Sequence, residues 1–146
     1  MEELVQSMKI ALANAYTLQL KAQNYHWNVE GPDFSQYHDL FAKIYEEVYA
    51  SVDVFAEEIR ALGAYAPGSL SRFGELSQIQ DETMVPSAMI MIEHILQDIR
   101  VCKSQLIPLF ELSEQNKTYG LSDFIAGRID VLSKHAWMLS ATLRRV

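Results

Sequence analysis

The sequence has a single cysteine, no long apolar run and fewer basic than acidic residues. Because Cys102 is the only cysteine among 146 residues, no disulfide can form within the chain, and a reducing cytoplasm is the expected compartment. No uninterrupted apolar stretch is long enough to span a membrane, and the N-terminal residues lack the pattern of a secretory signal peptide. The length suits one domain, residues 1–146, with a substantial core.

The shortage of basic residues limits what the protein is expected to bind. The chain has 12 Lys and Arg against 19 Asp and Glu, which gives a formal net charge of −7. This balance argues against a protein that wraps nucleic acid. It suits a protein that handles cations or forms a soluble assembly.

Four segments with helical periodicity cover most of the chain. The first two span residues 3–28 and 34–62, with Asp33 as the expected N-cap of the second, and two more begin at Pro86 and near Ser122. The long connection before Pro86 contains SLSRFGELSQI, which has the length and pattern of a short extra helix. One long crossover between helix pairs is typical of a ferritin-like bundle. The predicted fold is therefore all-α: a ferritin-like four-helix bundle with a short extra helix between helices two and three.

The second predicted helix has two stripes when successive residues are placed about 100° apart. The apolar stripe expected in the core contains Tyr37, Phe41, Ile44, Val48, Val52, Phe55, Ile59 and Leu62. The neighbouring stripe mixes metal-ligand types with tyrosines and contains His38, Ala42, Tyr45, Glu46, Tyr49, Asp53 and Glu57. This ligand stripe is too polar for a core and too aromatic for a solvent face. The residues expected to face solvent are Asp39, Lys43, Glu47 and Glu58.

The spacing within the ligand stripe predicts a metal site shared between subunits. Asp53 and Glu57 lie on one helix face, but His38 is fifteen residues before Asp53, which is roughly 22 Å along a straight helix. Two copies of this helix that cross antiparallel about a two-fold axis would bring the histidine of one to the carboxylates of the other. His26, in the corner NYHWNVEGPDF, can reach the same end as His38. Two imidazoles and two carboxylates suit Fe(II), Zn(II) or Mn(II).

The motif HWNVEGPDFSQYH, followed by DVFAE, resembles the Dps family of ferritin-like mini-ferritins. APGSLSRFGELSQI is similar to the short helix of that family and SDFIAGRIDVLSKHAWML to its last helix, so the resemblance covers nearly the whole chain. The resemblance implies a hollow dodecameric shell with ferroxidase sites at two-fold dimer interfaces. It also implies oxidation of Fe(II), typically by hydrogen peroxide, and storage of a ferric mineral inside the shell, without an organic cofactor.

The resemblance also implies individual roles for residues. The family's iron ligands match His26, His38, Asp53 and Glu57. Trp27 matches the aromatic residue beside the site, although it and Trp137 are equally well interpreted as packing anchors. Asp123 matches an acidic residue near the iron-entry pores, and a role as the cap of the fourth helix stays equally open.

Ala42 departs from the family pattern. It stands four residues after His38, where the family usually has an aspartate, so a second iron would lack a protein ligand. Glu46 is a candidate replacement, but its direction differs by some 40°. A Dps-like structural shell with impaired ferroxidase activity is therefore an alternative function. A di-iron oxidase with its site inside one bundle is excluded because no glutamate is followed by a histidine three residues later.

Four other residues have structural interpretations. His94 and His135 are interpreted as buried structural histidines, the commoner role of a lone histidine. Tyr45 and Tyr49 are most simply interface packing residues. A second interpretation makes the two tyrosines electron donors during oxidation.

We predict weak or absent DNA binding near neutral pH. Many family members use a lysine-rich tail, whereas here only Lys9 lies early in the chain and only Arg144 and Arg145 lie at its end. Duplex DNA is bound by neutralising its phosphates with Lys and Arg, with release of counterions. A gel-shift series from low to moderate salt, without divalent metal, measures the binding. Tight retention of DNA at moderate salt would contradict the prediction.

Overall fold

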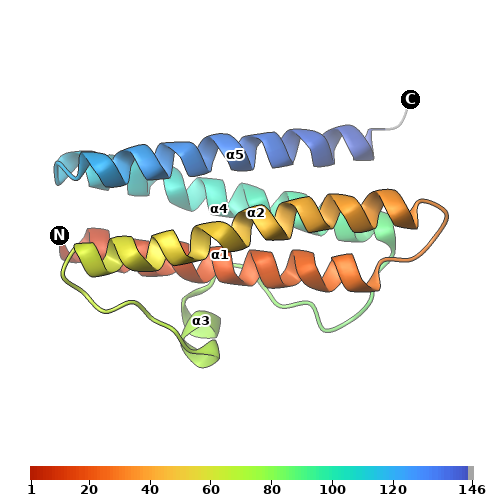
Figure 1. The fold of residues 1–146 in the computed structure, drawn as a ribbon, viewed down its shortest axis with the longest axis horizontal. Helices are drawn as coiled ribbons and strands as arrows, with labels where there is room; N and C mark the ends of the chain where they lie inside the picture. Colours follow the sequence, from red (N-terminus) through yellow and green to blue (C-terminus); the bar gives the residue numbers. More distant parts are fainter. Residues whose placement is uncertain (145–146) are drawn as a thin grey trace.

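The computed structural model describes residues 1–144, and helices account for most of them (Figure 1). In chain order the helices are α1 (Glu2–Asn28), α2 (Phe34–Ala61), α3 (Leu70–Leu76), α4 (Ala88–Gln115) and α5 (Tyr119–Leu143). The described residues contain no strand, so the all-α prediction is confirmed, including the short extra helix. Arg145, one of the arginines considered for DNA contact, lies outside residues 1–144.

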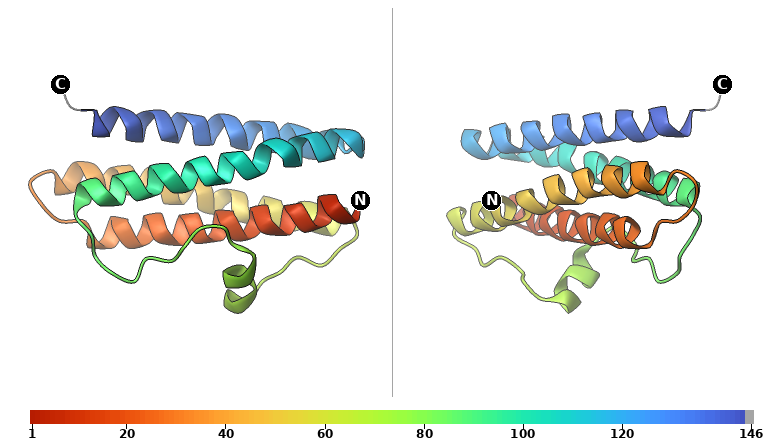
Figure 2. Two further views of the ribbon diagram at one scale, coloured as in Figure 1. Left: turned by 180° about the vertical axis from the view of Figure 1, so that it is seen from behind. Right: turned by 45° about the vertical axis from the view of Figure 1, so that its right-hand side comes forward.

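Four long helices form the bundle, and the crossover fixes their directions. Helices α1 and α2 form one antiparallel pair and α4 and α5 form the other (Figures 1 and 2). Residues 62–87 return the chain along the length of the bundle, so α2 and α4 run in the same direction (Figure 1). This connection carries α3, which packs against α1. No helix in residues 1–144 is both long enough and apolar enough to cross a membrane.

The first helix corner matches the sequence prediction at most positions. Helix α2 begins at Phe34 after Asp33, as predicted, but the Asp33 side chain makes no capping hydrogen bond. Gly31 has a φ of 119°, a conformation that residues with a Cβ rarely adopt. The glycine thus allows the sharp turn, and the buried Val29 anchors the corner to the core.

Two predicted helix starts were wrong by a few residues. Helix α4 begins at Ala88 rather than Pro86, because Ser87 is the N-cap and its hydroxyl accepts a hydrogen bond from the Ile90 amide at 3.4 Å. Helix α5 begins at Tyr119, with Thr118 as its N-cap residue.

Both serines near the α4–α5 turn bond across it instead of capping. The Ser122 hydroxyl lies 2.7 Å from that of Ser113 on α4, in the buried interior of the turn. Asp123 therefore lies inside α5 and is exposed, so its interpretation as a helix cap was wrong.

The apolar stripe of α2 lies in the core, as predicted. Its most buried members are Phe41, Ile44, Val48, Phe55 and Ile59, and Tyr37, Val52 and Leu62 pack against them. Pro108 lies inside α4 without ending it. The remaining core comes from the facing stripes of α1, α4 and α5.

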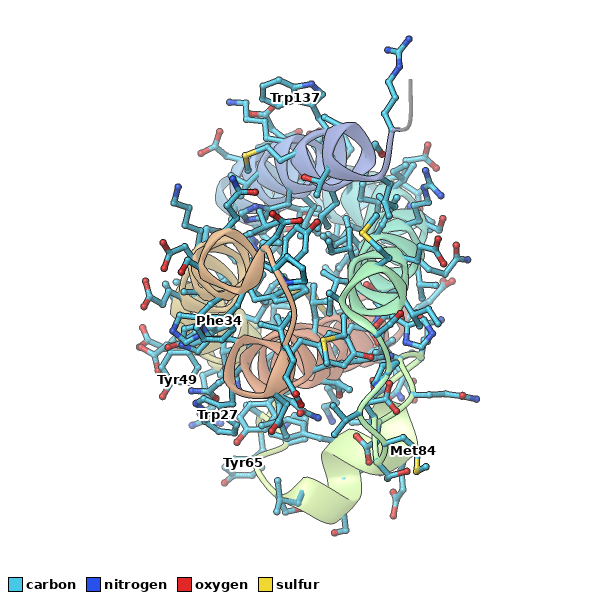
Figure 3. All side chains as sticks on the ribbon, turned by 90° about the vertical axis from the view of Figure 1, so that its right-hand side faces the viewer. Trp27, Phe34, Tyr49, Tyr65, Met84 and Trp137 are labelled. Atoms are coloured by element: carbon cyan, nitrogen blue, oxygen red, sulfur yellow. The ribbon has the colours of Figure 1, made fainter. Side chains whose placement is uncertain are left out.

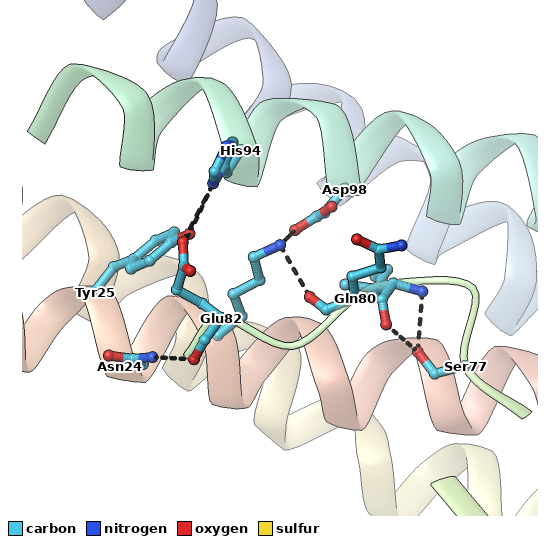
Figure 4. Close-up of polar contacts among 9 residues, drawn as sticks. Asn24, Tyr25, Ser77, Gln80, Glu82, His94 and Asp98 are labelled. Carbon is cyan, nitrogen blue, oxygen red and sulfur yellow. Dashed lines mark hydrogen bonds and ion pairs between the residues drawn. The ribbon is translucent and has the colours of Figure 1, made fainter. Parts of the chain in front are cut away.

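A polar network ties the crossover to α1 and α4 (Figure 4). Lys21 pairs with Asp98 at 2.9 Å and donates to the Gln80 carbonyl at 3.0 Å. The Tyr25 hydroxyl donates to the Glu82 carboxylate at 2.7 Å and lies 2.9 Å from His94 Nδ1. His94 thus has the structural role that the sequence indicated, but it is exposed rather than buried.

Glu47 does not face solvent, contrary to the prediction. Its carboxylate accepts hydrogen bonds from both terminal nitrogens of Arg128, one of them at 3.1 Å, and from His135 Nε2 at 3.0 Å. The side chains of Arg128 and His135 are only 9% and 8% exposed. The partners come from α5, whose position against α2 is not readable from the local pattern of α2. The structural interpretation of His135 is confirmed.

We predict that Glu47 stabilises the fold above acidic pH. Burial alone would raise the pKa of Glu47, but hydrogen bonds from His135 and Arg128 outweigh it and lower the pKa from 4.5 to about 2. A depressed folded-state pKa means that this stability is complete above pH 4.5 and disappears as the pH falls towards 2. Glu47→Gln should therefore lower the free energy of unfolding by about 2 kcal/mol at neutral pH.

Denaturant unfolding at a series of pH values and one protein concentration measures this effect. The loss caused by Glu47→Gln should shrink steadily below pH 4.5. Asp39→Asn, at an exposed position of the same helix, is the matched control and should change little. An equal loss at every pH would show that the carboxylate charge is irrelevant.

Candidate metal centre

The corner between α1 and α2 brings His26 and His38 into direct contact. His26 lies in the last turn of α1 and His38 near the start of α2. Their rings stack with centroids 3.7 Å apart and planes 17° apart. His26 Nδ1 lies 2.7 Å from the His38 carbonyl oxygen, and His38 Nδ1 lies 2.6 Å from the His26 carbonyl oxygen. The two histidines therefore fix each other through both rings and both backbones.

This exchange of hydrogen bonds sets the tautomer of both rings. A carbonyl oxygen only accepts, so Nδ1 must carry the hydrogen in His26 and in His38. In the neutral ring, the lone pair is then on Nε2, which is the atom available to a metal. Metal-binding histidines usually donate their other ring N–H to a carbonyl or carboxylate, which orients the ring. The pair has the chemistry of two oriented metal ligands.

Other aromatic rings flank the histidine pair. The Phe34 ring stacks on His38 with centroids 5.0 Å apart, and the Tyr45 ring is tilted against His26 with centroids 5.3 Å apart. Trp27 is 60% exposed and Trp137 is 69% exposed, so neither is a packing anchor within the chain. Figure 3 shows Trp27 and Phe34 on the side formed by α1 and α2, with Trp137 projecting from α5 elsewhere.

Asp53 and Glu57 form a second, acidic candidate half-site further along α2. Both side chains are exposed, and they lie one turn apart. A hydrogen bond with Asp53 and the negative charge of Asp53 raise the pKa of Glu57. A cation bound between the two carboxylates would reduce their mutual repulsion.

A groove adjoins this acidic half-site. It lies between α1, α2 and the residues before and within α3, and Tyr16, Tyr49, Asp53 and Phe73 are among its lining residues. The sequence did not indicate this groove, because the crossover that forms one wall is far from α2 in the chain.

The chain does not bring its two half-sites together. Among residues 1–144, no group of three or more His, Cys, Asp or Glu side chains is placed to hold a metal ion. Ala42 is half-buried and Glu46 is exposed, between the histidine pair and the acidic half-site on α2. Asp123, on α5, belongs to neither half-site. One chain therefore presents two imidazoles at one position and two carboxylates at another, as the helix spacing predicted.

Known proteins share this architecture over nearly its whole length. A family model described as a ferritin-like domain matches residues 6–146. DNA protection during starvation protein 2 of Bacillus anthracis is 30% identical over 144 residues, which cover 99% of each chain. The crystal structure of Dps from Staphylococcus aureus has a TM-score of 0.96 at 29% identity, and the match covers 100% of this chain and 98% of that one.

A further solved structure connects the fold to a chemical class. A Dps protein from Vibrio cholerae O1, described as a member of a broad superfamily of ferritin-like diiron-carboxylate proteins, has a TM-score of 0.94 at 26% identity. The match covers 98% of this chain and 90% of that chain. The fold and the match to the family model show that this chain belongs to the ferritin-like family. Within that family it is a member of the Dps family.

We predict that Asp53→Asn lowers the pKa of Glu57. The hydrogen bond and the charge of Asp53 hold the pKa of Glu57 above its usual value of 4.5, and the neutral amide removes the charge repulsion. Isotope-edited infrared titration of metal-free protein with labelled glutamate would follow the carboxyl band. Asp39→Asn, on the same helix but outside the ligand stripe, is the control. An unchanged glutamate titration in Asp53→Asn would contradict the coupling.

Proposed function

We propose that this protein is an iron-storage mini-ferritin that oxidises Fe(II), with hydrogen peroxide as oxidant, at sites shared between two subunits. The observation that carries the proposal is the division of the ligands. The oriented pair His26 and His38 lies at one position, and the exposed pair Asp53 and Glu57 lies at another. Two such chains would complete each other's metal site. The similarity to Dps proteins, one of which is described as a ferritin-like diiron-carboxylate protein, supports a function with iron.

The geometry of α2 supports a two-fold dimer. A separation of roughly 22 Å between the half-sites follows from the helical rise, so a second α2 that crosses antiparallel places each histidine pair against the carboxylates of the other chain. A two-fold contact of this kind makes two equivalent sites. Figure 3 shows Trp27, Phe34 and Tyr49 on the α1–α2 side. These side chains are 60%, 41% and 59% exposed, and a partner subunit would bury apolar area there.

The residues of the proposed site have distinct tasks toward their iron substrate. The Nε2 atoms of His26 and His38 bind Fe(II) as neutral donors. The carboxylates of Asp53 and Glu57 supply negative charge, which stabilises Fe(III) more than Fe(II) and so favours loss of the electron. The ferric product would be stored inside a dodecameric shell formed by single-domain subunits, residues 1–146, in the cytoplasm. Asp123 is assigned to an iron-entry pore of that shell.

A structural shell with impaired ferroxidase activity is the second candidate. Ala42 favours it, because a methyl group cannot coordinate the second iron and Glu46 is directed to solvent in the single chain. The proposed function keeps one tight iron per site. Anaerobic Fe(II) titration followed by stopped-flow oxidation with peroxide separates the two candidates, since the structural shell would not oxidise its iron rapidly.

We predict that two inactive variants restore each other when mixed. His38→Ala and Asp53→Ala should each lose peroxide-dependent Fe(II) oxidation. In a mixed dimer, the intact histidines of the Asp53→Ala chain meet the intact carboxylates of the His38→Ala chain. Random mixing should therefore leave about a quarter of the sites complete. Stopped-flow oxidation of Fe(II) by peroxide measures the recovery after co-assembly.

The control for this experiment is a mixture of two variants with the same half-site damaged. His26→Ala mixed with His38→Ala has no chain with an intact histidine pair and should stay inactive. If the complementary mixture stays equally inactive while wild-type protein oxidises iron, the shared site is wrong. If wild-type protein neither binds nor oxidises Fe(II), the ferroxidase function itself is wrong.

A further inference from the structure

This inference rests on the proposed function. At a site with one tightly bound Fe(II), the iron supplies too few electrons to reduce hydrogen peroxide to water. Hydrogen peroxide takes up two electrons and two protons to become two waters, whereas one Fe(II) supplies one electron on becoming Fe(III). A second iron at the site would supply the other electron. Ala42 removes a ligand for that iron, so a site with one tight iron needs another electron source or releases hydroxyl radical.

Tyr45 is positioned to be that source. Its ring is tilted by 48° against the ring of His26, with centroids 5.3 Å apart. It is half-buried and packs against the hydrophobic core. It lies three residues after Ala42, on the same stripe of α2. The Tyr45 phenol is therefore close to the position of the missing ligand, Ala42, and its ring contacts His26, a candidate iron ligand.

Other oxidisable rings near the site lack this contact. Tyr49 is 59% exposed and lies one turn further along α2, where it lines the groove beside Asp53. Trp27 is 60% exposed and projects from the end of α1. Among the ring pairs of residues 1–144, His26 contacts His38 and Tyr45. Electron transfer falls steeply with distance, so the ring in contact with the ligand is the favoured donor.

We propose that Tyr45 supplies the second electron for peroxide reduction, through its contact with His26. In the first turnover, Fe(II), the Tyr45 phenol, hydrogen peroxide and one proton give Fe(III), the Tyr45 phenoxyl radical and two waters. The peroxide O–O bond and the phenol O–H bond break, and iron and tyrosine each lose one electron.

A second turnover restores the phenol. After the Fe(III) product has left the site, the next Fe(II) binds and gives its electron to the phenoxyl radical, which takes up one proton. The sum of the two turnovers is two Fe(II), one peroxide and two protons converted to two Fe(III) and two waters. Tyr45 thus replaces a simultaneous second iron with a stored oxidising equivalent, and no hydroxyl radical leaves the site.

Radical detection in the assembled protein tests this role. The protein is loaded anaerobically with one Fe(II) per site, mixed with hydrogen peroxide and frozen rapidly for electron paramagnetic resonance. Wild-type protein should give a tyrosyl signal that narrows with ring-deuterated tyrosine. Tyr45→Phe should lose this signal and release hydroxyl radical to a spin trap. The matched variant Tyr49→Phe should keep the signal and release none.

Two further variants connect the signal to the electron deficit. Ala42→Asp supplies the missing carboxylate. When this variant is loaded with two Fe(II) per site, the second Fe(II) can give the second electron and the tyrosyl signal should fall. Tyr45→Trp keeps an oxidisable ring, and an indole radical should replace the phenoxyl signal. Circular dichroism and the anaerobic Fe(II) stoichiometry show that each variant is folded and loaded.

The outcomes separate this proposal from the function beneath it. Two results would show that the role of Tyr45 is wrong while the ferroxidase function stands, provided that wild-type protein oxidises iron. In the first, the tyrosyl radical persists in Tyr45→Phe. In the second, wild-type protein forms no tyrosyl radical and releases no hydroxyl radical to the spin trap. A radical that is located on Trp27 or Tyr49 in the wild-type protein also overturns the role of Tyr45. If peroxide oxidises no iron in wild-type protein, both proposals fail together.

Discussion

The rise of an α-helix sets the terms on which this protein can bind a metal. Each residue advances the helix by about 1.5 Å, so ligands on a straight helix share one ion only when they lie about one turn apart. Asp53 and Glu57 satisfy that limit, and His38 does not. The histidine therefore finds its nearest partner across the corner, in His26. The proposed two-subunit site, the exposed aromatic side chains of the α1–α2 side and the role given to Tyr45 all depend on this division.

The bundle interior shows why the proposed metal site lies outside it. Ferritin-like proteins with a site inside one bundle place carboxylates and histidines from four helices around two metals. Here Glu47 and His135 supply one carboxylate and one imidazole, but the guanidinium of Arg128 occupies the same cluster. A fixed positive charge with bonds to the carboxylate excludes a cation from that position. The interior charges stabilise the fold, and the proposed iron chemistry is assigned to the exposed face of α2.

Most of the fold was predictable from local patterns. Apolar periodicity identified the four long helices, and the Gly-containing corner identified the turn between the first two. Errors occurred where hydrogen bonds between elements decide the outcome. The predicted helix start near Ser122 is wrong, because α5 already begins at Tyr119 and the Ser122 hydroxyl bonds to Ser113 across a turn. Glu47 was assigned to solvent because its partners on α5 lie far away in sequence.

The sequence by itself determined which residues share a face of α2, and hence that His38 cannot meet Asp53 and Glu57 within one chain. Helical periodicity and rise are local properties of the backbone, so they need no knowledge of distant segments. Only the tertiary structure decided how the two imidazoles are oriented. The stacked rings of His26 and His38, their reciprocal hydrogen bonds and the contact of Tyr45 with His26 arise from the packing of α1 against α2. Those contacts depend on the placement of side chains to within about an ångström, and no local pattern in the sequence predicts such placement.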